Sequence, residues 1–92
     1  MFLKIASINF WGLKKPASID KEIRLKRLIE FIKNENLSIV CLQEIWLKQD
    51  LDFIINNLKD YYFAYDLNNK KKNPSGLLII TKFKILKKSF IN

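Results

Sequence analysis

Hydrophobic and polar positions divide the chain into short apolar runs and two stretches with helical spacing. Residues 2–9 alternate imperfectly between apolar and polar side chains, which is typical of a strand. Residues 39–42 form a short, β-branched run, which is typical of a strand buried on both faces. Between these segments, apolar side chains recur with the spacing of one helix face, at Leu25, Leu28, Ile29 and Ile32. The first half of the chain therefore predicts a strand–helix–strand unit.

The ends of this unit are also marked in the sequence. Ser18 or Asp20 can cap the start of the helix, since either side chain can accept a free first-turn N–H. A strand–helix–strand unit of this length makes a parallel, right-handed crossover. Asn9 and Glu44 each stand where a predicted strand ends. We therefore expect them at the same edge of the sheet, although they are far apart in the sequence.

The second half of the chain predicts one helix, a polar turn region and three strands. The apolar stripe of the helix covers residues 47–58, and the polar, basic turn region covers residues 66–75. The strands are apolar or aromatic runs at residues 61–65, 77–81 and 85–90, of which the last two are expected to form a hairpin. The predicted order is β-α-β-α-β-β-β, an α/β fold in one unit over residues 1–92 with no internal boundary.

Charge changes this picture little. The chain has 17 Lys and Arg residues against 9 Asp and Glu residues, a net charge of +8, which permits attraction to phosphates or to an anionic membrane. Most of the cations are lysines in a chain that is also rich in Asn and Ile, a mixture that AT-rich codons supply. The Lys70–Lys72 run with nearby aromatic residues leaves open a small basic nucleic-acid-binding module.

Cysteine content and hydropathy bear on location. Cys41 is the single cysteine and stands mid-strand, so a disulfide framework is excluded and a buried, inert thiol is expected. No apolar run approaches the roughly 18 residues that a membrane span needs. The first ten residues carry Lys4 and lack the apolar core of a signal peptide. A cytoplasmic location is the default expectation.

Glu44 is the candidate for chemistry that the pattern itself singles out. A carboxylate at the end of a buried strand needs a partner, because an unpaired charge near the core is costly. In open α/β sheets the ends of strands are also where ligands collect. A divalent cation and a lysine both fit this role, and the residue types alone do not separate them.

Three segments together resemble the beginning of the endonuclease/exonuclease/phosphatase superfamily. They are Asn9–Gly12, Leu42–Trp46 and Ser75–Phe83, and their order and spacing both match. The Asn-x-Trp-Gly element and the Gln-Asp pair after Trp46 are most similar to the neutral sphingomyelinase branch. The resemblance covers nearly the whole chain, whereas full members of the superfamily are several times longer.

The resemblance implies a fold, a cofactor and two site residues. The fold is a four-layer α/β/β/α sandwich, of which this chain supplies the N-terminal part. The implied chemistry is Mg²⁺-dependent hydrolysis of phosphate esters, with lipid and nucleic acid both open as substrates. Glu44 would be the metal-binding carboxylate, and Asn9 the amide that helps to hold the metal and the phosphate. Ser38 departs from the family, where an acidic residue commonly stands.

The chain lacks the other half of such a site. It contains no histidine, and no acidic residue follows Lys82. The family's later motifs supply further Asp and Asn residues and a histidine, and general base catalysis near neutral pH usually requires His or a tuned carboxylate. We therefore interpret the chain as a truncated phosphodiesterase that carries the first metal-site motifs and is inactive alone.

Two helices are too few to cover both faces of the predicted sheet. One face is therefore expected to stay apolar and exposed, with an open edge at the last strand. This predicts a second polypeptide that completes the domain. The small nucleic-acid-binding module and a strand-completing interaction module remain the alternatives to a hydrolase fragment.

Overall fold

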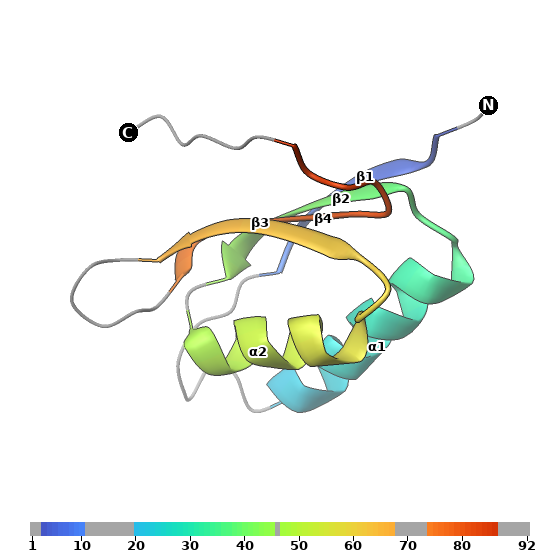
Figure 1. Cartoon of the computed structure of the whole chain (residues 1–92). Coiled ribbons are helices and arrows are strands. Elements are labelled where there is room, and N and C mark those ends of the chain that lie inside the picture. Colours follow the sequence, from blue (N-terminus) through green and yellow to red (C-terminus); the bar gives the residue numbers. More distant parts are fainter. Residues whose placement is uncertain (1–2, 11–19, 46, 68–73, 87–92) are drawn as a thin grey trace.

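Strands and helices alternate along the first two-thirds of the chain, as the hydrophobic pattern predicts. The computed structural model describes residues 3–10, 20–45, 47–67 and 74–86. Its elements are β1 (Ile5–Asn9), α1 (Lys21–Asn34), β2 (Ile39–Ile45), α2 (Lys48–Asn57), β3 (Tyr62–Leu67) and β4 (Pro74–Thr81) (Figure 1). The predicted α/β class and the first six elements of the predicted order are confirmed.

The four strands form one sheet in the order β1-β2-β4-β3. β1 runs parallel to β2, while β4 runs antiparallel to both β2 and β3. The predicted parallel crossover through α1 is therefore confirmed. In this register Asn9 lies opposite Gln43, so the end of β1 lies beside the end of β2.

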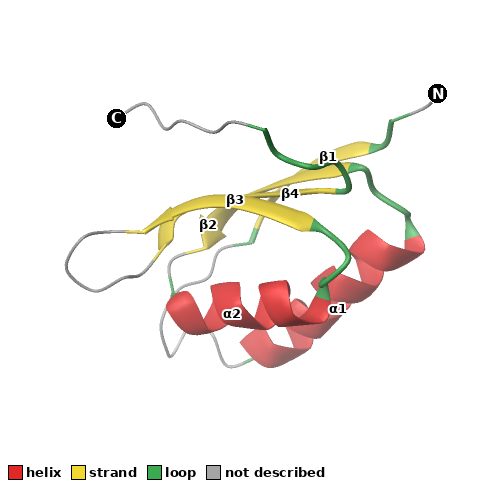
Figure 2. Ribbon diagram, in the orientation of Figure 1, coloured by secondary structure: helices red, strands yellow, loops and turns green. Residues whose placement is uncertain are grey.

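The hydrophobic core lies between the sheet and the two helices, which cover the same face (Figure 2). Alternate residues of the two central strands are fully buried in it, namely Val40, Leu42, Leu78 and Ile80. The helices contribute the apolar stripes that the sequence predicts, including Leu25, Leu28, Ile29, Ile32, Leu51 and Ile54. The apolar side chains recur at every second residue of the strands and about every 3.6 residues of the helices, and the two sets pack against each other in one apolar layer.

Neither of the two described helices lies over the other face of the sheet (Figure 2). Ile5 stays 63% exposed there, and Cys41 and Ile79 on the central strands are half-buried. The expectation of an apolar face without helical cover is confirmed for the described residues. The prediction of a buried Cys41 thiol is wrong, because Cys41 is only half-buried on the face that neither described helix covers.

The start of α1 differs from the predicted cap. Asp20 occupies the N-cap position but makes no side-chain capping hydrogen bond. Its carboxylate lies 3.6 Å from Nε of Arg24 one turn later, so the charge of Arg24 replaces the free N–H groups as its partner. Ser18, the other predicted cap, lies outside the described residues.

The predicted strand at residues 85–90 is not formed in its described part. Ile85 and Leu86 have no strand structure, and residues 87–90 lie outside the described residues. Leu86 is 91% exposed. The predicted hairpin with β4 is wrong for the described residues, because β4 is already paired with β2 on one side and β3 on the other. The turn after β4 is instead fixed by Lys82, whose backbone N–H donates to the carbonyl of Ser38 at 3.0 Å.

A buried ion pair joins the two helices. Nζ of Lys21, at the start of α1, lies 3.1 Å from Oδ2 of Asp50 in the first turn of α2, and the two side chains are only 10% and 2% exposed. Oδ2 is buried without a hydrogen-bond partner, so the contact is an ion pair that lacks hydrogen-bond geometry. Removing one partner of such a pair leaves the other charge buried and uncompensated.

We predict that Asp50→Asn lowers the free energy of unfolding by about 3 kcal/mol, because a neutral amide cannot balance the buried ammonium of Lys21. Asp52→Asn is the matched control in the same helix. Asp52 pairs with Lys48 at 3.0 Å, but both side chains are about half-exposed, so its loss should change stability by less than about 0.5 kcal/mol. Urea unfolding followed by far-UV circular dichroism measures both; equal effects would contradict the prediction.

Candidate metal-binding edge of the sheet

The two predicted site residues lie at the same edge of the sheet. Asn9 is the last residue of β1 and is exposed, whereas Glu44 is the penultimate residue of β2 and is half-buried. The ladder continues one step past Asn9, because the backbone N–H of Phe10 donates to the carbonyl of Gln43 at 2.9 Å. The predicted proximity of the two strand ends is therefore confirmed, while the roles of Asn9 and Glu44 stay predictions.

Glu44 is the extra residue of a β-bulge. The pairing of β2 with β4 passes from Gln43↔Leu77 directly to Ile45↔Gly76, which leaves Glu44 without an opposite residue. The extra residue shifts Ile45 to the core-facing side of the strand, where its side chain is fully buried. Without the bulge, Glu44 would take the core-facing position and Ile45 the open face.

The backbone of Glu44 is strained. Its φ is +69°, in the left-handed region, where residues other than glycine, asparagine and aspartate are uncommon. Asn36 has a similar φ of +52° after α1, but asparagine tolerates that conformation well. Such strain costs about 1–3 kcal/mol and is concentrated at functional sites. The outlier marks Glu44 as an unusual position of β2, independently of the sequence motif.

Gln43 is a site residue that sequence reasoning missed. Its side-chain Nε2 donates to Oγ of Ser7 at 3.0 Å and to the carbonyl of Cys41 at 3.1 Å, which ties β2 to β1 on the open face. Both amide hydrogens are used, so only the amide oxygen is left to bind a further group. Its place opposite Asn9 could be predicted only once the register of the two strands was known.

The donor atoms at this edge fit a hard cation such as Mg²⁺. They are the carboxylate of Glu44 and the side-chain oxygens of Asn9 and Gln43, all oxygen ligands. The described residues contain no group of three or more His, Cys, Asp or Glu side chains that could enclose a metal. A single carboxylate with amide oxygens suits Mg²⁺, which keeps several waters and takes substrate phosphate as a ligand. It does not suit structural zinc, which takes His or Cys ligands.

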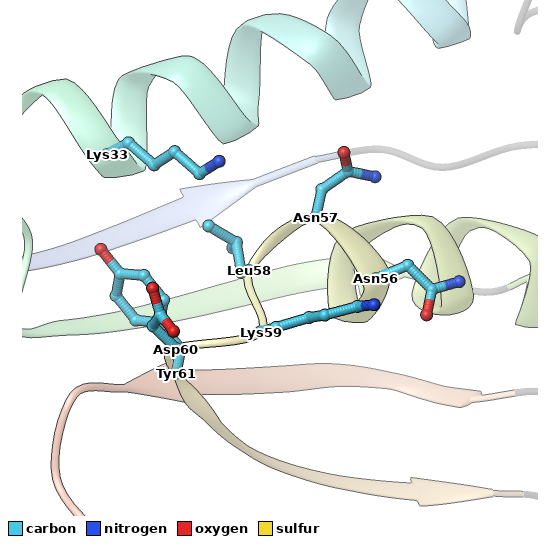
Figure 3. Close-up of a pocket in the computed structure, with 7 residues that line it drawn as sticks. All are labelled: Lys33, Asn56, Asn57, Leu58, Lys59, Asp60 and Tyr61. Atoms are coloured by element: carbon cyan, nitrogen blue, oxygen red, sulfur yellow. The ribbon is translucent and has the colours of Figure 1, made fainter.

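Other residues singled out from the sequence give no further geometry. Trp11, Trp46 and Lys70–Lys72 lie outside the described residues. A pocket of about 320 Å³ at the C-terminal end of α2 is lined by Lys33, Asn56, Asn57, Leu58, Lys59, Asp60 and Tyr61 (Figure 3). Lys33 belongs to the last turn of α1, just before β2 begins, so the pocket lies at the opposite end of the sheet from Asn9 and Glu44.

The sequence pattern of the Endonuclease/Exonuclease/phosphatase family matches residues 6–91. The chain belongs to this family. Among curated proteins it is similar to human sphingomyelin phosphodiesterase 2, with 29% identity over 83 residues. It is similarly related to the mouse protein of that name, at 28% identity over 83 residues. The matches cover 90% of this chain but only 19% and 20% of those proteins, so the chain spans about a fifth of their length.

Solved structures of the same family share the fold. A crystal structure of an endonuclease/exonuclease/phosphatase from Bacteroides vulgatus superposes with a TM-score of 0.70 at 21% identity, covering 86% of this chain and 31% of that one. A family protein from Leptotrichia buccalis gives a TM-score of 0.60 at 17% identity, covering 94% and 40%. The predicted N-terminal portion of an α/β sandwich is therefore confirmed.

The family to which the chain belongs has a characteristic chemistry. The family consists of phosphodiesterases and phosphohydrolases that act on phosphoester substrates, and it is generally metal-dependent. The phosphoester substrates and the metal dependence of the family both agree with what the resemblance implies. Neither helix of the described chain is long and apolar enough to cross a membrane.

The bulge predicts an unusual response to mutation at Glu44. Glu44→Gly should leave the free energy of unfolding unchanged or raise it by up to about 1 kcal/mol, because glycine adopts positive φ without strain. Glu44→Val should lower it by about 1–2 kcal/mol, since a β-branched residue is strongly disfavoured there. Urea unfolding of both variants measures the difference. Asn36→Gly is the control at the other left-handed position, and equal stabilities for the two Glu44 variants would rule out a left-handed backbone at the bulge.

Proposed function

We propose that this chain carries the metal-binding part of a Mg²⁺-dependent phosphodiesterase, with Glu44 as the metal-binding carboxylate. The observation that carries the proposal is the β-bulge, which holds Glu44 in a strained conformation beside the end of β1. A strained glutamate, an asparagine at the end of the neighbouring strand and a family of metal-dependent phosphoester hydrolases together favour a cation at this edge.

Each residue of this edge has a distinct task in the proposal. The carboxylate of Glu44 binds the cation, which when present stabilises negative charge on the phosphoryl oxygens. The side chain of Asn9 helps to hold the cation through its oxygen or a phosphoryl oxygen through its amide hydrogens. Gln43 keeps both strand ends in place, because its amide hydrogens bond to Ser7 and Cys41.

The substrate that we propose is a phosphodiester, with a sphingomyelin-type lipid favoured over nucleic acid. This preference comes from the relatives, which are named sphingomyelin phosphodiesterase 2 in human and mouse. Because the chain spans about a fifth of those proteins, their activity is carried over here as a proposal only.

We further propose that residues 1–92 are one N-terminal portion of the family domain, inactive without the remainder. The chain has no histidine and no acidic residue after Asp66, so neither of the usual general bases near neutral pH is available in residues 67–92. The open face of the sheet, with Ile5 and half-buried Ile79, would be covered by a second sheet from further chain or from a second polypeptide.

Mn²⁺ titration tests the metal site, with the free ion followed by electron paramagnetic resonance. The wild-type chain should bind Mn²⁺, and Glu44→Gln should weaken binding at least about tenfold, because an amide replaces the charged ligand while keeping its shape. Glu30→Gln, an exposed glutamate of α1, is the matched control and should bind like wild type. Unchanged binding by Glu44→Gln would refute the proposal.

The same variants separate the nucleic-acid alternative, which rests on the Lys70–Lys72 run with nearby aromatic residues. A basic binding module would bind single-stranded DNA with a steep salt dependence that survives Glu44→Gln. If the chain is instead part of a metal-dependent hydrolase, Glu44→Gln should weaken Mn²⁺ binding. The two hypotheses thus differ in whether this substitution lowers the affinity for Mn²⁺ or leaves a salt-dependent affinity for DNA as the chain's binding activity.

Hydrolysis assays test the proposed incompleteness. With Mg²⁺, the chain alone should release no phosphocholine from sphingomyelin above the background of Glu44→Gln, because it lacks a general base. Sequencing the coding DNA beyond the codon for Asn92 should reveal further Asp and Asn motifs and a histidine. The joined protein should then be active, and Glu44→Gln should abolish that activity. Glu44-dependent turnover by the chain alone would contradict the proposal.

A further inference from the structure

Arg24 of α1 contacts Phe10, the residue that follows Asn9. Its Nη1 donates to the carbonyl of Phe10 at 3.2 Å, and its guanidinium carbon lies 5.3 Å from the centre of the Phe10 ring. The N–H of Phe10 is held separately by the carbonyl of Gln43 at 2.9 Å. Phe10 is only 6% exposed, so its backbone and its ring are both fixed where the chain leaves β1.

These contacts lie one residue from each candidate ligand. Phe10 follows Asn9 directly, and Gln43, to which Phe10 bonds, precedes Glu44 directly. The N–H of Phe10 belongs to the peptide unit that begins at Asn9, and its carbonyl belongs to the next unit. The two bonds together therefore fix the backbone on both sides of the Phe10 Cα, and with it the path by which the chain leaves Asn9. Arg24 itself makes its side-chain contacts with Phe10 and Asp20 rather than with either candidate ligand.

The contact is not the most stabilising arrangement for this position. Nε and Nη2 of Arg24 are buried without a hydrogen-bond partner, and its ionic neighbour Asp20 is 3.6 Å away and largely exposed. Buried donors without acceptors destabilise a fold, and apolar replacements of buried ions are often neutral or stabilising. An unbranched apolar side chain such as methionine could pack on Phe10 without these unsatisfied donors.

We propose that Arg24 is a positioning residue for this edge of the sheet, which holds the carbonyl of Phe10 and thereby orients Asn9 relative to Glu44. The inference rests on the proposed metal-binding role of Asn9 and Glu44, and it requires no contact between Arg24 and the metal or the substrate. Residues that orient metal ligands commonly change metal affinity by about 10–100-fold when they are replaced.

The test compares Arg24→Met and Arg24→Lys with the wild-type chain. Arg24→Met should unfold at the same or a higher urea concentration, yet the amide hydrogen of Phe10 should exchange about tenfold faster relative to that of Ile32 in α1. In the same variant, Mn²⁺ should bind about tenfold more weakly. Arg24→Lys keeps a cationic donor within reach of the Phe10 carbonyl. It should therefore bring both the exchange rate of the Phe10 amide hydrogen and the Mn²⁺ affinity most of the way back to their wild-type values.

Each other outcome has a definite meaning. If Arg24→Met lowers stability and speeds exchange at Phe10 and Ile32 alike, Arg24 is a packing residue and the inference is wrong. Unchanged exchange at Phe10 overturns it as well. If the wild-type chain binds no Mn²⁺, the proposed function fails instead, and the exchange of Phe10 still decides whether Arg24 fixes the end of β1.

Discussion

The parallel pairing of β1 with β2 is the constraint on which the rest of this structure depends. The ladder runs from Ile5↔Ile39 to Asn9↔Gln43 and brings together two strand ends that the sequence separates by a whole helix. Because parallel strands require a crossover, α1 must run back across one face of the sheet. That path sets the core, the uncovered face and the edge where Asn9 and Glu44 meet.

At that edge, core packing and backbone strain act against each other at adjacent residues. Burying the Ile45 side chain is worth about 1.5–3 kcal/mol, whereas placing Glu44 at positive φ costs about 1–2 kcal/mol. The bulge is therefore affordable, because the same shift that strains Glu44 returns Ile45 to the core. The arrangement also removes a carboxylate from a core-facing position, where an unpaired charge would be far more costly.

The two helices cover only one face of the sheet, so the described residues contain one side of the family's sandwich. The two helices and their buried stripes complete one apolar layer, and the opposite face exposes Ile5 to solvent. The family's sandwich has a second sheet, and the curated relatives are about five times as long as this chain. The open face of the described sheet and the absence of histidine from the sequence are both features that the proposed function takes into account.

The sequence by itself determined the elements of the described core, the parallel crossover and the placement of Asn9 and Glu44 at neighbouring strand ends, because apolar periodicity encodes which face of each element is buried. Tertiary structure alone decided the bulge at Glu44, the contact of Arg24 with Phe10 and the ion pair of Lys21 with Asp50. The spacing of apolar residues along the chain does not predict any of these three features. Each depends on the register and the angle at which two elements pack. The predicted strand at residues 85–90 is wrong at its described start for a related reason, since β4, its expected hairpin partner, is already paired on both sides by β2 and β3.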